Sequence, residues 1–142
     1  MATTVNNTTV NSRITIIFDA SGALDGNGPA KGTGNTESDV YLDDTVHYNV
    51  RSHTEIDANV HALQWDASTN TGEIQYIDNR DNLNLSSFPQ WATNVVIRCE
   101  AQDAWQTAYN GHADAGAEDD SAAVTAANTA RTNYLTAHSI TY

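Results

Sequence analysis

The sequence has little positive charge. Lys31 is its single lysine, and the formal net charge is −12 at pH 7. A surface this negative repels phosphate backbones and anionic lipid headgroups, so we expect neither nucleic-acid binding nor membrane binding. It keeps a protein soluble and suits a cationic partner.

Cysteine and long apolar segments are also scarce. Cys99 is the one cysteine, which excludes an internal disulfide. Nothing local offers the base that a catalytic thiolate needs, so we interpret Cys99 as a small buried thiol. No apolar run approaches the roughly 20 residues of a membrane-spanning helix, and residues 1–7 lack the features of a signal peptide. We therefore expect a soluble protein made in a cytoplasm.

Metal-binding patterns are incomplete in this chain. His47, His53 and His61 lie close together in sequence, but their spacing matches no zinc motif, and we interpret them as surface or packing histidines. The segment 19–30 has a composition typical of calcium loops. Alanine stands at its fifth and twelfth positions, where an EF-hand needs oxygen ligands. The sequence thus predicts no metal and no cofactor.

Catalytic motifs are missing as well. The neighbouring carboxylates Asp43–Asp44 and Asp119–Asp120 are adjacent in sequence, whereas glycosidase chemistry needs two carboxylates that face each other across a substrate. There is no nucleophile elbow, no P-loop and no dinucleotide-binding fingerprint. We expect a protein that is not an enzyme and has no catalytic residues.

The first part of the chain is rich in extended segments. Residues 13–19 are apolar and β-branched and predict a strand, and residues 40–42 and 46–51 predict two short ones. Residues 21–35 carry five glycines and predict a long loop. The runs 60–65 and 72–77, separated by a short polar segment, predict a β-hairpin in which Trp65 and Tyr76 form a cross-strand pair.

The last part of the chain has helical patterns. Residues 87–90 have the spacing of a capping box, and a helix is expected from about Phe88 to Tyr109. A second, alanine-rich helix is expected over residues 122–135, with a thin apolar face. We expect the two helices to pack as an αα-hairpin against one face of the sheet.

The predicted fold class is therefore α+β. A small antiparallel sheet in about the first 80 residues precedes two C-terminal helices. With 142 residues the chain fits one domain, predicted over 13–142, and residues 1–12 are expected to form a flexible arm with little to bury.

The hairpin segment supports a family resemblance. Its first strand reads Ala62-Leu63-Gln64-Trp65, its second begins Gly72-Glu73-Ile74-Gln75-Tyr76, and the capped segment 84–89 follows. This arrangement, over about residues 60–110, resembles small virion-associated proteins of tailed bacteriophages, many from marine or cyanobacterial hosts. The resemblance implies a tail or tail-fibre component, made in the host cytoplasm and located in the virion. It implies no catalytic residues.

A virion component would act through contacts with other virion proteins and with copies of itself. The arm, the hairpin and the helical pair are the expected contact surfaces. The candidate contact residues are Val5, Val10, Trp65, Tyr76, Trp91, Trp105, Val124, Tyr134 and Leu135. Three alternatives stay open: a capsid decoration protein, a tail-fibre assembly chaperone, and a glycan-binding module that uses exposed tryptophans.

Overall fold

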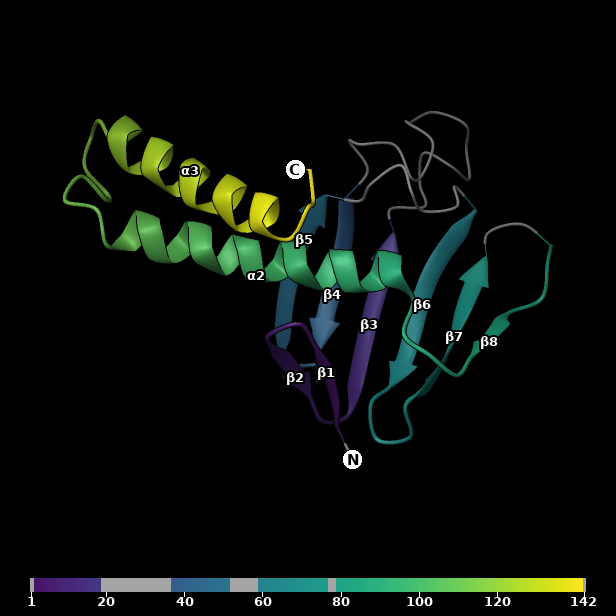
Figure 1. Ribbon diagram of the computed structural model, residues 1–142. Coiled ribbons are helices and arrows are strands. Elements are labelled where there is room, and N and C mark those ends of the chain that lie inside the picture. Colours follow the sequence, from purple (N-terminus) through teal and green to yellow (C-terminus); the bar gives the residue numbers. More distant parts are fainter. Residues whose placement is uncertain (1, 19–36, 52–58, 77–78, 142) are drawn as a thin grey trace. The chain divides into compact units, whose positions relative to one another are not determined.

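A computed structural model describes residues 2–18, 37–51, 59–76 and 79–141 of the chain. The chain divides into two compact units, Met1–Val96 and Ile97–Tyr142. Strands come first and two helices follow, so the predicted α+β class is confirmed (Figure 1). The predicted loop 21–35 and the residues His53 and Asp57 lie outside the described residues.

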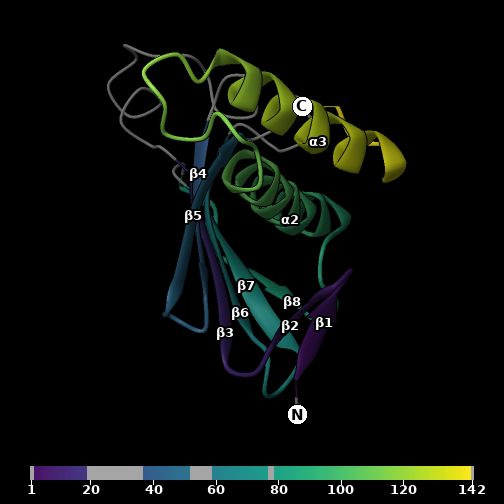
Figure 2. The same ribbon diagram turned by 90° about the vertical axis from the view of Figure 1, so that its left-hand side faces the viewer.

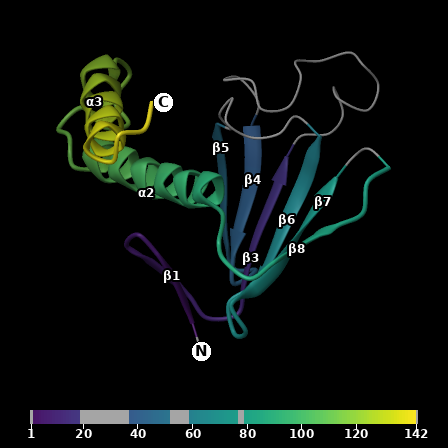
Figure 3. The ribbon, with the colours of Figure 1, turned by 45° about the vertical axis from the view of Figure 1, so that its right-hand side comes forward.

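The first unit is built on a six-stranded sheet. Its strands are β3 (Arg13–Phe18), β4 (Glu37–Leu42), β5 (Val46–Arg51), β6 (Val60–Asp66), β7 (Thr71–Tyr76) and β8 (Leu83–Leu85). Their spatial order is β5-β4-β3-β6-β7-β8, and every neighbouring pair is antiparallel (Figure 3). The apolar segment predicted as a strand over 13–19 therefore lies in the middle of the sheet.

The predicted hairpin forms from β6 and β7, but its aromatic pair does not. Trp65 lies opposite Gly72, and Tyr76 lies opposite Val60 at the other end of the ladder. The predicted Trp65–Tyr76 pair is wrong because antiparallel strands bring together residues at equal distances from the turn, and Trp65 is next to it. Tyr76 instead lies under the Arg80 guanidinium, whose carbon is 4.4 Å from the ring centroid.

One face of the sheet is apolar and buries a core within the first unit. The fully buried side chains include Ile14, Ile16, Phe18, Val40 and Leu63. Residues just beyond β8 pack on this same inner face. The Phe88 ring meets Trp65 edge-on at 5.2 Å, and the Trp91 ring lies 5.7 Å from Phe18.

The N-terminal residues form a second small sheet instead of the predicted loose arm. The strands β1 (Thr3–Val5) and β2 (Thr8–Val10) are antiparallel, and Val5 and Val10 are buried, with 4% and 1% exposure. The Trp65 indole Nε1 donates to Thr3 Oγ1 at 2.9 Å, which places this hairpin on the inner face of the large sheet (Figure 2). The expectation that this segment has little to bury is wrong, because its two valines supply an apolar face once a sheet receives them.

Helix α2 (Gln90–Asn110) begins in the first unit. Its start lies two residues later than predicted, and the Pro89 carbonyl accepts the first helical hydrogen bonds, from Ala92 and Thr93. Proline suits this boundary because its own nitrogen has no hydrogen to donate.

The second unit is a helical hairpin of the remaining part of α2 and helix α3 (Ser121–Ala137), as the predicted αα pairing requires. Ile97, Ala101 and Leu135 form its buried cluster, against which Tyr134 and Ile140 pack. Polar pairs link the helices: Trp105 Nε1 donates to Asn128 Oδ1 at 2.8 Å, and Tyr134 Oη donates to Glu100 Oε1 at 2.8 Å. The predicted packing of this pair against the sheet stays a prediction.

Cys99 is buried, as predicted. Burial raises the pKa of the Cys99 thiol, and the nearby Asp103 and Glu100 carboxylates raise it further. The thiol therefore stays protonated at neutral pH and has the character of a small apolar side chain.

The attachment of the N-terminal hairpin can be tested at Thr3. Its hydroxyl accepts from the Trp65 indole and donates to Asn70 Oδ1 at 2.6 Å. Thr3→Val keeps the shape but leaves the buried indole N–H without an acceptor, which costs roughly 1–3 kcal/mol. We expect a lower free energy of unfolding and faster amide exchange in residues 3–10.

Thr4→Val is the matched control, because Thr4 is exposed and, among the described residues, its hydroxyl contacts only Thr9. Equal unfolding free energies and exchange rates for Thr3→Val and Thr4→Val would contradict the assigned role of Thr3.

Candidate functional site

The face of the large sheet opposite the core carries a continuous row of polar and aromatic side chains. One residue from each strand contributes, and the registers place them side by side from one edge to the other. From β5 to β8 the row is His47, Tyr41, Thr15, Gln64, Glu73 and Asn84. Neighbouring strands are about 4.8 Å apart, so adjacent side chains in the row are within contact distance. We call this row the polar row.

The β5–β4 end of the polar row is held by aromatic stacking and hydrogen bonds. The Tyr41 and His47 rings stack with centroids 4.7 Å apart. His47 Nε2 lies 2.9 Å from Asp39 Oδ1, and Asn49 Nδ2 donates to the same oxygen at 3.1 Å. These side chains are therefore held in place by one another.

The opposite end of the polar row opens into a groove of about 600 Å³. The side chains of its lining supply hydroxyl, amide, guanidinium and carboxylate groups. The lining residues are Ser12, Arg13, Gln64, Trp65, Asp66, Ser68, Thr71, Gly72, Glu73 and Asn84. All of them belong to the first unit. We call it the polar groove.

Several side chains of the polar groove are oriented by neighbours. Thr15 Oγ1 donates to Gln64 Oε1 at 2.9 Å. The amide nitrogen of Gln64 has no hydrogen-bond partner within the described residues. Gln75 Nε2 donates to Glu73 Oε1 at 3.1 Å. The hydroxyl and backbone N–H of Ser68 both donate to Asp66, and these hydrogen bonds lower the pKa of its carboxyl group.

Gly72 is required by its position in the hairpin. A Cβ atom at this residue would lie 2.5 Å from the Gln64 carbonyl oxygen and 2.8 Å from Trp65 Cε3. No side chain larger than hydrogen fits without moving the backbone of β6. The strands β6 and β7 therefore approach closely at Gly72, beside Trp65, and this close approach forms part of the wall of the polar groove.

A second polar feature lies at the short link between β2 and β3, which contacts the turn between β4 and β5. Asp43 and Asp44 both have positive φ, 55° and 58°, and form the tight turn between β4 and β5. Asp43 Oδ1 accepts hydrogen bonds from the backbone N–H of Ser12 at 2.6 Å and from its hydroxyl at 2.8 Å. The N–H groups of Asn11 and Arg13 point to the same carboxylate. Led by the Ser12 backbone hydrogen bond, these donors lower the pKa of Asp43 from 3.8 to about 2.

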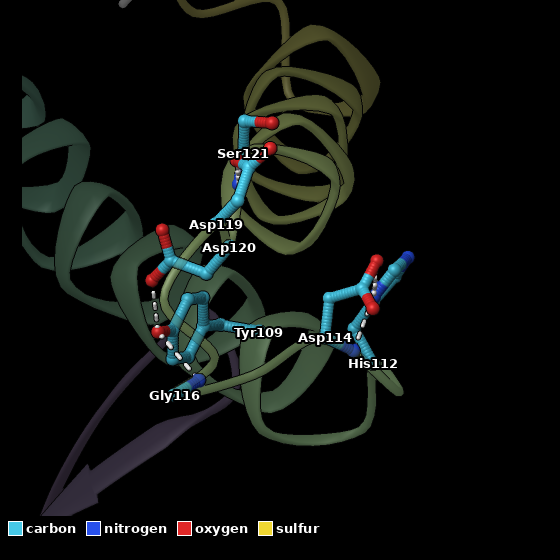
Figure 4. A network of polar contacts seen from close by, with 7 residues as sticks. All are labelled: Tyr109, His112, Asp114, Gly116, Asp119, Asp120 and Ser121. Atoms are coloured by element: carbon cyan, nitrogen blue, oxygen red, sulfur yellow. Dashed lines mark hydrogen bonds and ion pairs between the residues drawn. The ribbon is translucent and has the colours of Figure 1, made fainter.

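In the second unit the loop between the helices is organised around Tyr109 (Figure 4). Its hydroxyl donates to Asp120 Oδ2 at 2.5 Å and accepts from the Gly116 N–H at 3.1 Å. Gly116 has a φ of 75°, a conformation that favours glycine. The Tyr109 ring also stacks on Trp105, 5.3 Å away. Asp120 thus joins the two helices, whereas Asp119 accepts from the Ser121 N–H at the start of α3.

The candidate partner contacts divide into two groups. Val5, Val10, Trp65 and Leu135 are buried, so their side chains face the protein interior. Tyr76, Trp91, Trp105, Val124 and Tyr134 are partly exposed. The exposed large apolar side chains of the described residues are instead Val46 and Leu83, with 45% and 49% exposure, one on each edge strand. The sequence patterns missed both.

Residues for metal binding do not gather in the described part of the chain, where no three His, Cys, Asp or Glu side chains form a cluster. His47 and His61 lie on β5 and β6, with two strands between them. Within the same residues, no helix is long and apolar enough to span a membrane. No family model, no curated protein and no solved structure matches the chain.

The Asp43 contact predicts a pH dependence of stability. Because the pKa of Asp43 is lower in the folded state than its ordinary 3.8, its contribution is complete above about pH 4 and is lost as the pH falls toward 2. Asp43→Asn tolerates the positive φ but lacks the charge. We expect it to lower the free energy of unfolding at pH 7 by roughly 1 kcal/mol, a value reduced for solvent exposure, and to flatten the acid limb of the stability profile.

Asp44→Asn is the matched control, since Asp44 is adjacent, has the same backbone conformation, is exposed and makes no side-chain hydrogen bond within the described residues. Chemical denaturation between pH 2 and 7 provides the measurement. Indistinguishable profiles for the two variants would show that the contact of the Asp43 carboxylate with residues 11–13 does not stabilise the fold.

The Tyr109 network predicts a stability effect in the second unit. Tyr109→Phe removes one donor and one acceptor, and we expect a loss of about 1 kcal/mol, measured by thermal or chemical unfolding. Tyr76→Phe serves as control because the Tyr76 hydroxyl forms no hydrogen bond within the described residues. A Tyr109→Phe protein as stable as Tyr76→Phe would show that the Tyr109 hydroxyl does not stabilise this loop.

Proposed function

We propose that this protein is a non-enzymatic structural protein of a bacteriophage virion, associated with the tail or its fibres. It acts through contacts with other virion proteins and with copies of itself. The observation that carries the proposal is the resemblance of the segment around β6 and β7, Ala62-Leu63-Gln64-Trp65 and Gly72-Glu73-Ile74-Gln75-Tyr76, to small virion-associated proteins.

The exposed apolar side chains on the edge strands support a role in assembly. Val46 on β5 and Leu83 on β8 are each about half exposed, and both strands are edges of the described sheet. Edge strands have backbone groups that can pair with another chain, and exposed apolar residues beside them supply burial in an interface. The net charge of −12 favours a partner with a basic surface.

The proposal predicts that the protein remains with particles during purification. In the phage that encodes it, the protein should follow the particles through a density gradient at a constant ratio to the major virion proteins, as measured by quantitative mass spectrometry. A protein found in infected lysate but absent from purified particles would overturn the proposal and would favour the assembly-chaperone alternative.

Edge-strand variants locate the contacts in the same experiment. Val46→Asp and Leu83→Asp are expected to lower incorporation into particles, because a charge placed in an apolar contact is costly to bury. Thr45→Asp is the control next to Val46, since Thr45 is an exposed polar residue. Equal incorporation of all three variants would exclude these two edges as the contact surfaces.

A further inference from the structure

We infer that the polar groove is a binding site for an uncharged saccharide. This site differs from the edge-strand contacts of the proposed function and does not depend on them. At about 600 Å³, the polar groove falls within the range of small-molecule sites, roughly 300–1,000 Å³. The ligand class follows from the groups that line it.

The lining is rich in planar side chains with two hydrogen-bonding atoms each. They are the guanidinium of Arg13, the amides of Gln64 and Asn84, and the carboxylates of Asp66 and Glu73. A planar group with two polar atoms can bind two neighbouring hydroxyl groups at once, which is the pattern that a sugar ring presents. The serine and threonine hydroxyls of the lining add groups that can donate or accept.

Free hydrogen-bonding capacity is available at the groove. The Arg13 guanidinium, the Gln64 amide nitrogen and the Asn84 amide have no hydrogen-bond partner within the described residues. Gln64 and Glu73 are each oriented by a neighbour, Thr15 and Gln75. Because Gln64 and Glu73 are partly fixed by these hydrogen bonds before a ligand arrives, these two side chains lose little freedom on binding.

Charge and polarity select among ligand classes. The lining holds one guanidinium and two carboxylates, and the chain carries −12 overall, which disfavours phosphates and acidic sugars. Peptide ligands usually place an apolar side chain in an apolar pocket. The one large apolar residue of the lining, Trp65, is only 2% exposed, so it offers no such pocket. An uncharged polyhydroxyl ligand fits both constraints.

Saccharide titrations of the full-length chain test the inference. Maltose, lactose, cellobiose and N,N′-diacetylchitobiose are added at millimolar concentration, and backbone amide shifts are followed by NMR. We expect at least one of them to shift the amides of Gln64, Glu73 and Asn84. Asn84→Ala should then weaken binding about five- to tenfold, as expected for the loss of one to two hydrogen bonds. Arg13→Gln, a change on β3 instead of β8, should also weaken saccharide binding.

Asn49→Ala is the matched control, because Asn49 is an exposed amide on the same face but outside the polar groove. Its saccharide affinity should equal that of the unmodified chain. The absence of binding by all four sugars would overturn the inference, as would binding that Asn84→Ala and Arg13→Gln leave unchanged. Binding of a polar peptide, and of no sugar, at these residues would assign the groove to a different ligand class. None of these outcomes depends on incorporation into particles.

Discussion

The burial of Trp65 is the constraint on which the first unit depends. Its indole donates to Thr3, its ring is met edge-on by Phe88, and its backbone lies opposite Gly72. Three segments that are remote in sequence, the N-terminal hairpin, the central sheet and the entry to α2, therefore converge on one side chain. A large aromatic ring with a single polar atom suits this role, because it buries much apolar area while its N–H still requires a partner.

The strand that carries Trp65, β6, has polar side chains on its other face. Gln64, the residue before Trp65, belongs to the polar row and takes part in the polar groove. Successive side chains of a strand point to opposite faces, so the packing that fixes Trp65 also fixes where Gln64 stands. The inner face gains stability from burial, whereas the side chains of the polar row other than Thr15 stay half-buried or exposed.

The sequence was sufficient for the fold class and for the location of most elements. Apolar β-branched runs identified β3 and the β6–β7 hairpin, and an alanine-rich stretch identified α3, because these signals are local. The N-terminal hairpin escaped prediction because its place in the fold depends on distant residues, as the contact of Thr3 with Trp65, 62 positions later, illustrates.

The polar groove was beyond prediction for a related reason. Its side chains belong to strands that are separated in sequence, and each of them alone, such as Asn84 or Arg13, resembles an ordinary surface residue. Only the order β3-β6-β7-β8 brings them together. Asp43 is similar: the sequence shows only two adjacent acidic residues, whereas in the fold its carboxylate accepts from three backbone N–H groups of residues 11–13.

The two units place different demands on a chain that is synthesised from its N-terminus. The polar contacts between the two helices join residues 11 to 34 positions apart, from Tyr109–Asp120 to Glu100–Tyr134. Thr3, in contrast, contacts Trp65 and Asn70, which lie 62 and 67 positions later in the sequence. Such long-range contacts form slowly, because a long loop has to close first. The N-terminal hairpin therefore reaches its contacts on the sheet only after the chain has been synthesised as far as Asn70.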